Sequence, residues 1–294
     1  MPSRCICRSQ DVLTDKLPSL GRRSSCVAVL CLNGVIGRVG GGRRGLNLQG
    51  LERRLDAAFK GRQLIAVAVS INSPGGSPVQ SELIAKRIRD LATERDVPVY
   101  TFIEDVGASG GYWLACAGDE IYAGNSSIVG SIGVVSGGFG FMEMLKKLGI
   151  ERRLYTSGDK KAMNDPFGPE KAAEVKHLKA LQGDIHKDFI GLVKARRGEK
   201  LNGNDRTLFS GAYWTGARAL ELGLIDGIGD LRSVMRAKLG DNVKFKVFDE
   251  RRSWLQRRFS MGALAGSGTG VRVGFADDMV AAMEERLLWN RFGL

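Results

Sequence analysis

The chain has 294 residues, 43% of them hydrophobic and 26% charged, a balance that excludes an intrinsically disordered protein. The 44 basic residues outnumber the 32 acidic ones, and the net charge of +12 permits contact with nucleic acid or an anionic membrane surface. We expect a diffuse surface charge without a specific nucleic-acid site, and the five cysteines have the spacing of neither a zinc site nor a disulfide framework.

The beginning of the chain is polar and basic. Residues 1–24 have no sustained periodicity, and we expect them to form a flexible arm. The first apolar run, residues 26–32, is shorter than the ~20 residues that a membrane span needs, and no signal-peptide cleavage site follows it. We therefore predict a cytoplasmic protein, with peripheral contact at the inner face of a membrane as the alternative.

Strand and helix patterns alternate over the first half of the chain. Residues 26–32, 64–71 and 97–103 are short apolar runs rich in valine and isoleucine, typical of strands buried on both faces of a mainly parallel sheet. Residues 48–60 and 78–93 have helical patterns between them. This alternation predicts βαβ crossovers and an α/β fold.

The helix at residues 78–93 has the clearest start signal. Ser77 can cap it, Pro78 suits the first helical position, and Gln80 completes a capping box. The apolar residues at helical spacing predict one buried stripe, made of Val79, Leu83, Ile84, Ile88 and Leu91.

The second half of the chain contains shorter elements and one long helix. We expect helices at residues 108–117 and 141–149, and strands at 126–138, 153–156 and 243–248. Residues 169–197 predict a long, charge-rich helix that protrudes from the core. Thr215 caps a further helix that ends at Gly223, and a strand, a turn and a helix follow over residues 224–239. Residues 250–294 form a basic, amphipathic tail, with a helix at 276–292 that could lie on a membrane or on a sister subunit.

One serine lies on a glycine hinge where a strand gives way to a helix. Ser109 stands between Ala108 and Gly110, and such a serine needs a neighbouring base to become a nucleophile. The two histidines, His177 and His186, are nine residues apart in one helix pattern. At about 100° per residue they point to opposite faces. We therefore expect lysine as the base.

Two backbone segments can supply an oxyanion hole. The stretch Asn-Ser-Pro-Gly-Gly at residues 72–76 follows a predicted strand directly, and its two glycines leave N–H groups unblocked. Gly110, at the start of a helix, supplies another N–H, and the helix dipole favours developing negative charge there.

The lysine candidates are Lys160 and Lys161, between turn signals in residues 157–167. A lysine base must have its pKa lowered from ~10.4 towards ~7–8 by burial or a nearby cation. On an extended segment the two side chains point in different directions, and the residue pattern does not choose between them.

Five motifs in order resemble the signal peptide peptidase family, the SppA, protease IV and SohB-like serine peptidases. They occupy residues 72–77, 108–113, 128–134, 158–167 and 214–229, within a peptidase domain at residues 25–249. The resemblance implies a spiral of ββα units, as in ClpP and the crotonases, and a Ser/Lys dyad of Ser109 and Lys161, with Lys160 in place of a common aromatic residue.

The same resemblance assigns the remaining site residues. Gly75, Gly76 and Gly110 would form the oxyanion hole, and Gly130, Ser131, Ile132 and Gly133 would border the pocket for substrate residues before the scissile bond. It implies no metal or cofactor. It also implies a homo-oligomer that cleaves peptides, such as leftover signal peptides or segments of unfolded protein.

Two other functions fit parts of the sequence. A catalytically silent scaffold or membrane-associated homologue would keep the fold, although intact Ser109 and Lys161 weigh against it. A crotonase-type acyl-CoA enzyme would need a glutamate near the thioester carbon, and the nearest acids, Glu104 and Asp105, are expected at the end of a strand.

Overall fold

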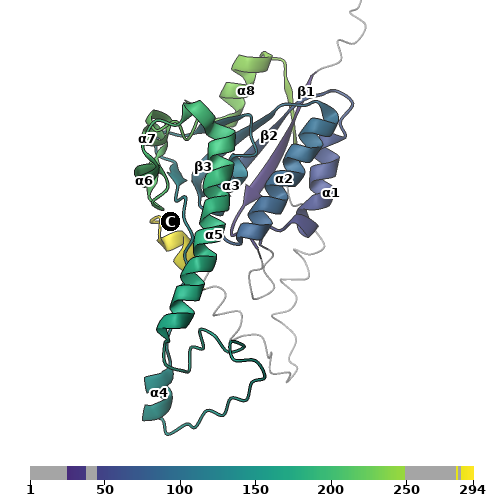
Figure 1. Cartoon of the computed structure of the whole chain (residues 1–294). Helices are drawn as coiled ribbons and strands as arrows, with labels where there is room; N and C mark the ends of the chain where they lie inside the picture. The colour runs from purple at the N-terminus through teal and green to yellow at the C-terminus, as the bar shows by residue number, and fades with distance from the viewer. Residues whose placement is uncertain (1–24, 38–44, 249–282, 284–285) are drawn as a thin grey trace, which may run out of the picture.

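The computed structural model describes residues 25–37, 45–248, 283 and 286–294, and Figure 1 shows them as one sheet flanked by helices. The described part of the first half alternates strands and helices as predicted: β1 (Cys26–Asn33), α1 (Leu48–Phe59), β2 (Leu64–Ser73), α2 (Pro78–Arg95) and β3 (Val99–Ala108). The expected arm at residues 1–24 and most of the basic tail at 250–294 lie outside the described residues.

The sheet is mostly parallel, which confirms the predicted α/β class. Within the described residues it has eight strands, with β6-β5-β3-β2-β1-β8 as its main path and with β4 paired to β3 and β7. Among the described strands, only β6 runs antiparallel, beside β5. The later strands are β4 (Glu120–Ala123), β5 (Ile128–Gly130), β6 (Tyr213–Thr215), β7 (Gly227–Ile228) and β8 (Lys244–Phe248).

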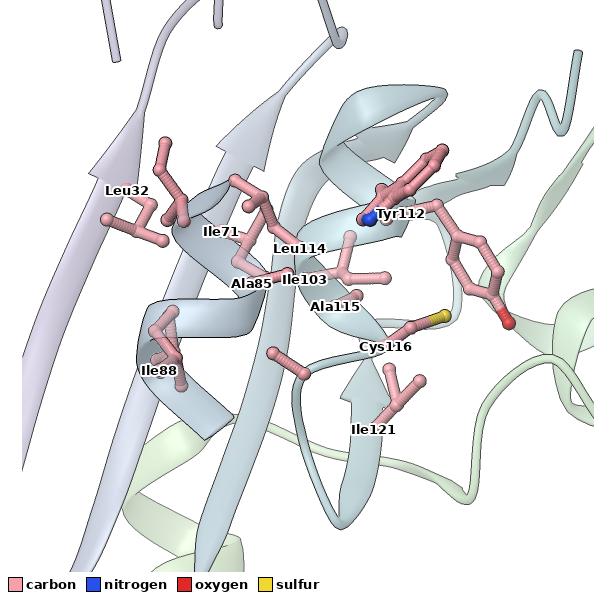
Figure 2. Close-up of a cluster of buried hydrophobic side chains, with 14 of the residues drawn as sticks. Leu32, Ile71, Ala85, Ile88, Ile103, Tyr112, Leu114, Ala115, Cys116 and Ile121 are labelled. Carbon is pink, nitrogen blue, oxygen red and sulfur yellow. The ribbon is translucent and has the colours of Figure 1, made fainter. Parts of the chain in front are cut away.

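Helices cover both faces of the sheet (Figure 1). Side chains alternate along β1, so that Ala28, Leu30 and Leu32 face the larger core with α1, α2, α3 (Gly110–Ala115) and α5 (Ala172–Arg197). The smaller core on the other face contains Val27 and Met235, the latter from α8 (Leu231–Leu239). Figure 2 shows part of the larger core, where Leu114 and Ala115 of α3 pack among side chains of the strands and of α2.

The predicted stripe of α2 is only partly correct. Ile84, Ile88 and Leu91 are buried, but Val79 is 60% exposed and Leu83 is 38% exposed. The other buried positions of α2 are Ser81, Ala85 and Ala92, so its buried face is turned away from Val79 and Leu83. Small residues there bring α2 close to α1 and α3.

The N-terminal cap of α2 contains one of the two predicted hydrogen bonds. Ser77 caps the helix as expected, because its hydroxyl accepts a hydrogen bond from the Gln80 N–H at 3.4 Å. Gln80 does not return the bond to Ser77. Its Oε1 accepts from the Leu48 N–H at 2.9 Å and so ties the first turns of α1 and α2 together. The capping box is therefore half formed.

Residues 134–171 leave the sheet and form what we call the extension. It contains α4 (Met142–Lys147), none of whose residues is buried. The strand predicted at residues 153–156 is absent from this described segment, because no neighbouring strand is there to pair with it. The strand predicted at 126–138 ends at Gly130, since Ser131 takes a positive φ of 52°.

The long helix protrudes as predicted. The buried residues of α5 (Phe189, Val193 and Arg197) all lie in its last third, and its first half carries the extension away from the sheet (Figure 1). The chain returns through α6 (Asp205–Leu208) and α7 (Gly216–Glu221), and Thr215 caps α7 as predicted. None of the helices in the described part of the chain combines the length and the apolar character that crossing a membrane requires.

Candidate active site

Ser109 joins the end of β3 to the start of α3 in a strained conformation. Its backbone φ is +53°, a value that residues other than glycine rarely adopt. Its N–H donates to the Gly130 carbonyl of β5 at 2.8 Å, and its carbonyl accepts from the Trp113 N–H at 3.0 Å. The half-buried side chain is thereby held at a sharp strand-to-helix turn, the geometry that presents a nucleophile.

The Gly75–Gly76 turn packs directly against Ser109. A Cβ on Gly75 would lie 2.8 Å from Ser109 Cβ and 2.9 Å from the Gly110 nitrogen. A Cβ on Gly76 would lie 2.1 Å from the Ile36 carbonyl oxygen. Both glycines also have positive φ, so only glycine lets this turn approach the serine.

The three predicted oxyanion N–H groups differ in their surroundings. The Gly75 N–H donates to Ser73 Oγ at 3.2 Å. The N–H groups of Gly76 and Gly110 have no hydrogen-bond acceptor among the described residues. The structure thus brings Gly75 and Gly110 beside Ser109, and it leaves two backbone donors available at this end of the sheet.

The predicted substrate-binding residues continue from β5. Gly130 lies against the ring of Trp214, where a Cβ would come within 2.8 Å of the ring carbons. The Ser131 N–H donates to the Ala212 carbonyl at 2.7 Å. Ile132 is fully buried, so its side chain belongs to the core and only its backbone could face a substrate. Gly133 packs on Gly211.

The histidines have other roles. His186 Nε2 lies 3.1 Å from the Ile132 carbonyl oxygen, so it supports the residues after β5. His177 is exposed on the protruding part of α5. In the part of the chain that the structure describes, neither histidine hydrogen-bonds to Ser109.

Lys160 and Lys161 lie on the extension. Both are exposed in a turn closed by the hydrogen bond from the Lys161 N–H to the Gly158 carbonyl at 3.1 Å. The hollow at this turn is lined by residues 157–161 alone. Figure 1 shows the extension beyond the lower end of α5, whereas Ser109 lies at the sheet. The single chain therefore brings the oxyanion turn to Ser109 but leaves both lysines on a separate segment.

The two acids considered for an acyl-CoA enzyme are held within β3. Glu104 accepts a hydrogen bond from the Ser70 hydroxyl, and Asp105 accepts one from Asn72 Nδ2 at 2.8 Å. Cys116, the one fully buried thiol among the described cysteines, is no alternative nucleophile, because burial raises its pKa to about 12.

A buried arginine that the sequence analysis did not single out ties the last motif to the core. Arg197, at the end of α5, donates from Nε and Nη2 to the Gly223 carbonyl at 2.9 and 2.8 Å and from Nη1 to Asp226 at 2.6 Å. Tyr112 of α3 donates to the neighbouring Leu224 carbonyl at 2.7 Å. These hydrogen bonds of Arg197 and Tyr112, which we call the clamp, hold α3, the helix that follows Ser109. Because charged residues are common at helix ends, the sequence gives no signal for this role of Arg197.

Comparison with known proteins gives the family. The model of peptidase family S49 matches residues 92–244, which include Ser109, Lys161 and more than half of the chain. The chain belongs to peptidase family S49. The resemblance predicted from the five motifs is therefore confirmed.

The relatives in this family differ in length. The Na(+)/H(+) antiporter NhaA of Brucella abortus is 53% identical over 243 residues, which cover 82% of this chain but 33% of that protein. A putative signal peptide peptidase SppA of Enterococcus faecium is 30% identical over 74% of this chain and 64% of that protein. A putative protease of Synechocystis is 30% identical over 78% of this chain and 80% of that protein. The chain thus spans about a third of the Brucella relative and just under two thirds of the Enterococcus one.

A solved structure confirms the fold of this S49 chain. A mutant of the 1510-N membrane-bound stomatin-specific protease, in complex with a substrate peptide, aligns with a TM-score of 0.50 at 15% identity. The alignment covers 81% of this chain and 98% of that one.

Proposed function

We propose that the chain is a serine endopeptidase that cleaves peptides through an acyl-enzyme on Ser109. The observation that carries the proposal is the packing of Gly75 against Ser109 and Gly110, which places a strained serine beside open backbone N–H groups. Membership of family S49 supports the same chemistry. An acyl-transfer site needs this combination of nucleophile and preorganised donors.

The proposed cycle uses this chain's own residues. Neutral Lys161 takes the Ser109 proton while Ser109 Oγ attacks the peptide carbonyl carbon, and the N–H groups of Gly110 and of the Gly75–Gly76 turn stabilise the oxyanion. The protonated lysine then gives its proton to the leaving amine. Lys161 next deprotonates a water molecule that attacks the ester, and it returns this proton to the departing Ser109 Oγ as the acid is released.

We further propose that the chain acts as a homo-oligomer, in which the extension brings Lys161 to a Ser109. The separation of the extension from the sheet supports this, because the single chain leaves the lysine exposed. Docking of the extension would bury the lysine, and burial lowers a lysine pKa towards the range that a base needs.

The substrates that we propose are peptides and unfolded protein segments, such as leftover signal peptides. Gly130 at the end of β5, with Ser131, Ile132 and Gly133 after it, would border the acyl side of the substrate through backbone atoms. The proposed location is cytoplasmic, with the basic tail as a peripheral membrane contact. If the tail makes that contact, deletion of residues 251–294 should abolish binding to anionic liposomes, and undiminished binding would contradict that role.

Casein degradation by purified variants tests the dyad. Ser109→Ala and Lys161→Ala should each lose cleavage while keeping the wild-type melting temperature, whereas Lys160→Ala should keep activity. If Ser109→Ala lost casein cleavage but Lys161→Ala kept full activity, the general base would be another residue. An inactive wild type that still binds unfolded protein would favour the silent scaffold.

A mixing experiment tests the oligomer. If the lysine acts on a serine of another copy, unfolding and refolding the two inactive variants together should restore part of the activity, because some sites then combine an intact Ser109 with an intact Lys161. Each variant refolded alone is the control. A mixture as inactive as its components would show that serine and lysine act within one chain.

A further inference from the structure

Strand β3 carries two extra residues just before the nucleophile. β2 and β3 pair in register up to Ile71 and Ile103, and they pair again at Ser73 and Gly107. One residue of β2, Asn72, therefore stands opposite three residues of β3, 104–106. This is a β-bulge, a feature that re-aims a strand and is frequent beside active sites.

The bulge lies where β3 exchanges one neighbour for another. Residues Tyr100–Ile103 pair with β4, whereas Val106–Ala108 pair with β5. The pairing with β5 continues into the hydrogen bond from the Ser109 N–H to Gly130. The bulge thus decides which strand the last residues of β3 follow, and so where Ser109 stands.

The Asn72 side chain closes the bulge from β2. Its Oδ1 accepts from the Val106 N–H at 3.2 Å, and its Nδ2 donates to Asp105 Oδ2 at 2.8 Å. Its own carbonyl accepts from the Gly34 N–H at 2.9 Å, so the asparagine is anchored to the chain that follows β1. An amide suits this position, because it can accept from a backbone N–H and donate to a carboxylate at once.

The bulge is compact on its other side. The Ser127 hydroxyl lies 3.2 Å from the Ile103 carbonyl oxygen and also contacts the Glu104 carbonyl. The Ile103 side chain folds over Gly107, where a Cβ would come within 2.8 Å of it. Between these contacts, Asn72 links β2 to Asp105 and Val106, the part of the bulge that leads to Ser109.

We propose that Asn72 is a positioning residue, which sets the place of Ser109 relative to the oxyanion turn. The inference rests on the proposed peptidase function. Asn72 begins the segment that leads to Gly75 and Gly76, and its side chain holds the segment that leads to Ser109. One residue therefore couples the two halves of the proposed site, although it touches neither the substrate nor the reacting atoms.

An exchange of the two side chains tests this coupling. In Asn72→Asp, two carboxylates face each other, and kcat should fall about 10²-fold, the cost of a small misplacement of catalytic groups. Combining Asn72→Asp with Asp105→Asn restores the hydrogen bond between the two side chains with donor and acceptor exchanged, while the carboxylate at position 72 accepts from the Val106 N–H as the amide oxygen did. We expect kcat of this double variant to return to within about fivefold of wild type, with KM changed less than threefold throughout.

The measurements are kcat and KM on a fluorogenic peptide, the rate at which an active-site phosphonate labels Ser109, and the melting temperature. Ser70→Ala is the matched control, because it removes another side-chain link between β2 and β3, to Glu104, and should keep kcat within threefold. Wild-type kcat in Asn72→Asp, or a double variant that recovers its melting temperature but not its kcat, would overturn the proposal.

Hydrogen exchange separates this inference from the proposed function. Asn72→Asp should speed amide exchange at Val106 and Ser109, and the double variant should reverse the change, whether or not the protein cleaves peptides. A wild type without activity or labelling would refute the peptidase proposal. Unchanged exchange at both amides in Asn72→Asp would refute the positioning role in either case.

Discussion

Gly75 has no space for a side chain, because a Cβ there would lie within 3 Å of both Ser109 and the Gly110 nitrogen. This contact joins residues from two strand ends that are far apart in the sequence. Glycine spacing predicts a turn at this place, but it does not predict what the turn touches. At the scale of single residues, the proposed site is therefore defined by close backbone approach rather than by side-chain chemistry.

Gly75→Ala should abolish the proposed activity and should also lower stability, because the new Cβ would stand at a positive φ and within 3.0 Å of Ser109, Gly110 and Ala108. The added methyl would press on Ser109 and cover the Gly110 N–H, and loss of one oxyanion donor costs about 10²–10³-fold in kcat. The measurement is phosphonate labelling of Ser109. Gly34→Ala is the control, because Gly34 has nearly the same φ, +108° against +106°, but nothing within 4 Å of the added Cβ. It should lose about 1–2 kcal/mol of stability and keep its activity.

At the scale of elements, α5 is attached to the sheet by a buried charge pair. Arg197, with a side chain only 2% exposed, meets Asp226, which also accepts hydrogen bonds from Lys200 at 2.7 Å and from the Ile121 N–H at 2.8 Å. Burial tends to raise the pKa of Asp226. The hydrogen bonds from Arg197 and Lys200 outweigh burial and hold the pKa below its usual value.

Acid should therefore weaken the attachment of α5. A carboxylate whose folded pKa is lowered adds stability above its unfolded pKa of about 3.9, and that stability is lost as the pH falls through the folded pKa. Asp226→Asn should lower the free energy of unfolding at pH 7 by about 3 kcal/mol, because it leaves Arg197 buried without a counter-charge.

The measurement is urea unfolding between pH 7 and pH 2.5. Asp226→Asn should lose less stability than wild type below about pH 4, since the titrating group is gone. Glu221→Gln removes the exposed pair with Arg218 and should change stability by less than about 0.5 kcal/mol. If wild type and Asp226→Asn lost the same free energy of unfolding at low pH, other carboxylates would be responsible for the acid sensitivity.

At the scale of the whole molecule, the extension exposes apolar side chains that the fold of one chain does not cover. Phe139, Leu148, Ile150 and Tyr155 are 75%, 62%, 53% and 89% exposed. Its aromatic contacts lie within the extension itself, such as that between Phe141 and Phe167, whose ring centroids are 5.5 Å apart. The proposed homo-oligomer would cover this surface.

Leu148→Glu should dissociate the oligomer without unfolding the chain. A charge at a buried interface is costly, whereas Leu148 contributes little to the single chain because most of it is exposed. Light scattering after size exclusion gives the mass, and the melting temperature checks folding. Val247→Glu, at a 50% exposed position on β8, is the control and should keep the wild-type mass. An unchanged mass in Leu148→Glu would place the interface elsewhere.

Much of the fold could be predicted from local patterns. The apolar runs, the cap at Ser77 and the spacing of Ile84, Ile88 and Leu91 each depend on neighbours within one element, so they located β1, β2, β3 and α2. The same reasoning placed Val79 and Leu83 in the core. It was wrong there, because helical spacing does not tell how much of an apolar stripe the neighbouring elements cover.

The candidate site divides in the same way. Ser109, Gly75 and Gly110 could be chosen from the sequence, since a serine on a glycine hinge and a glycine turn are local signals. The β3 bulge, the exposed place of Lys161 and the clamp at Arg197 came only from the tertiary structure. Strand register, the path of a segment away from the sheet and the burial of a charge depend on contacts between distant parts of the chain, and no local pattern encodes them.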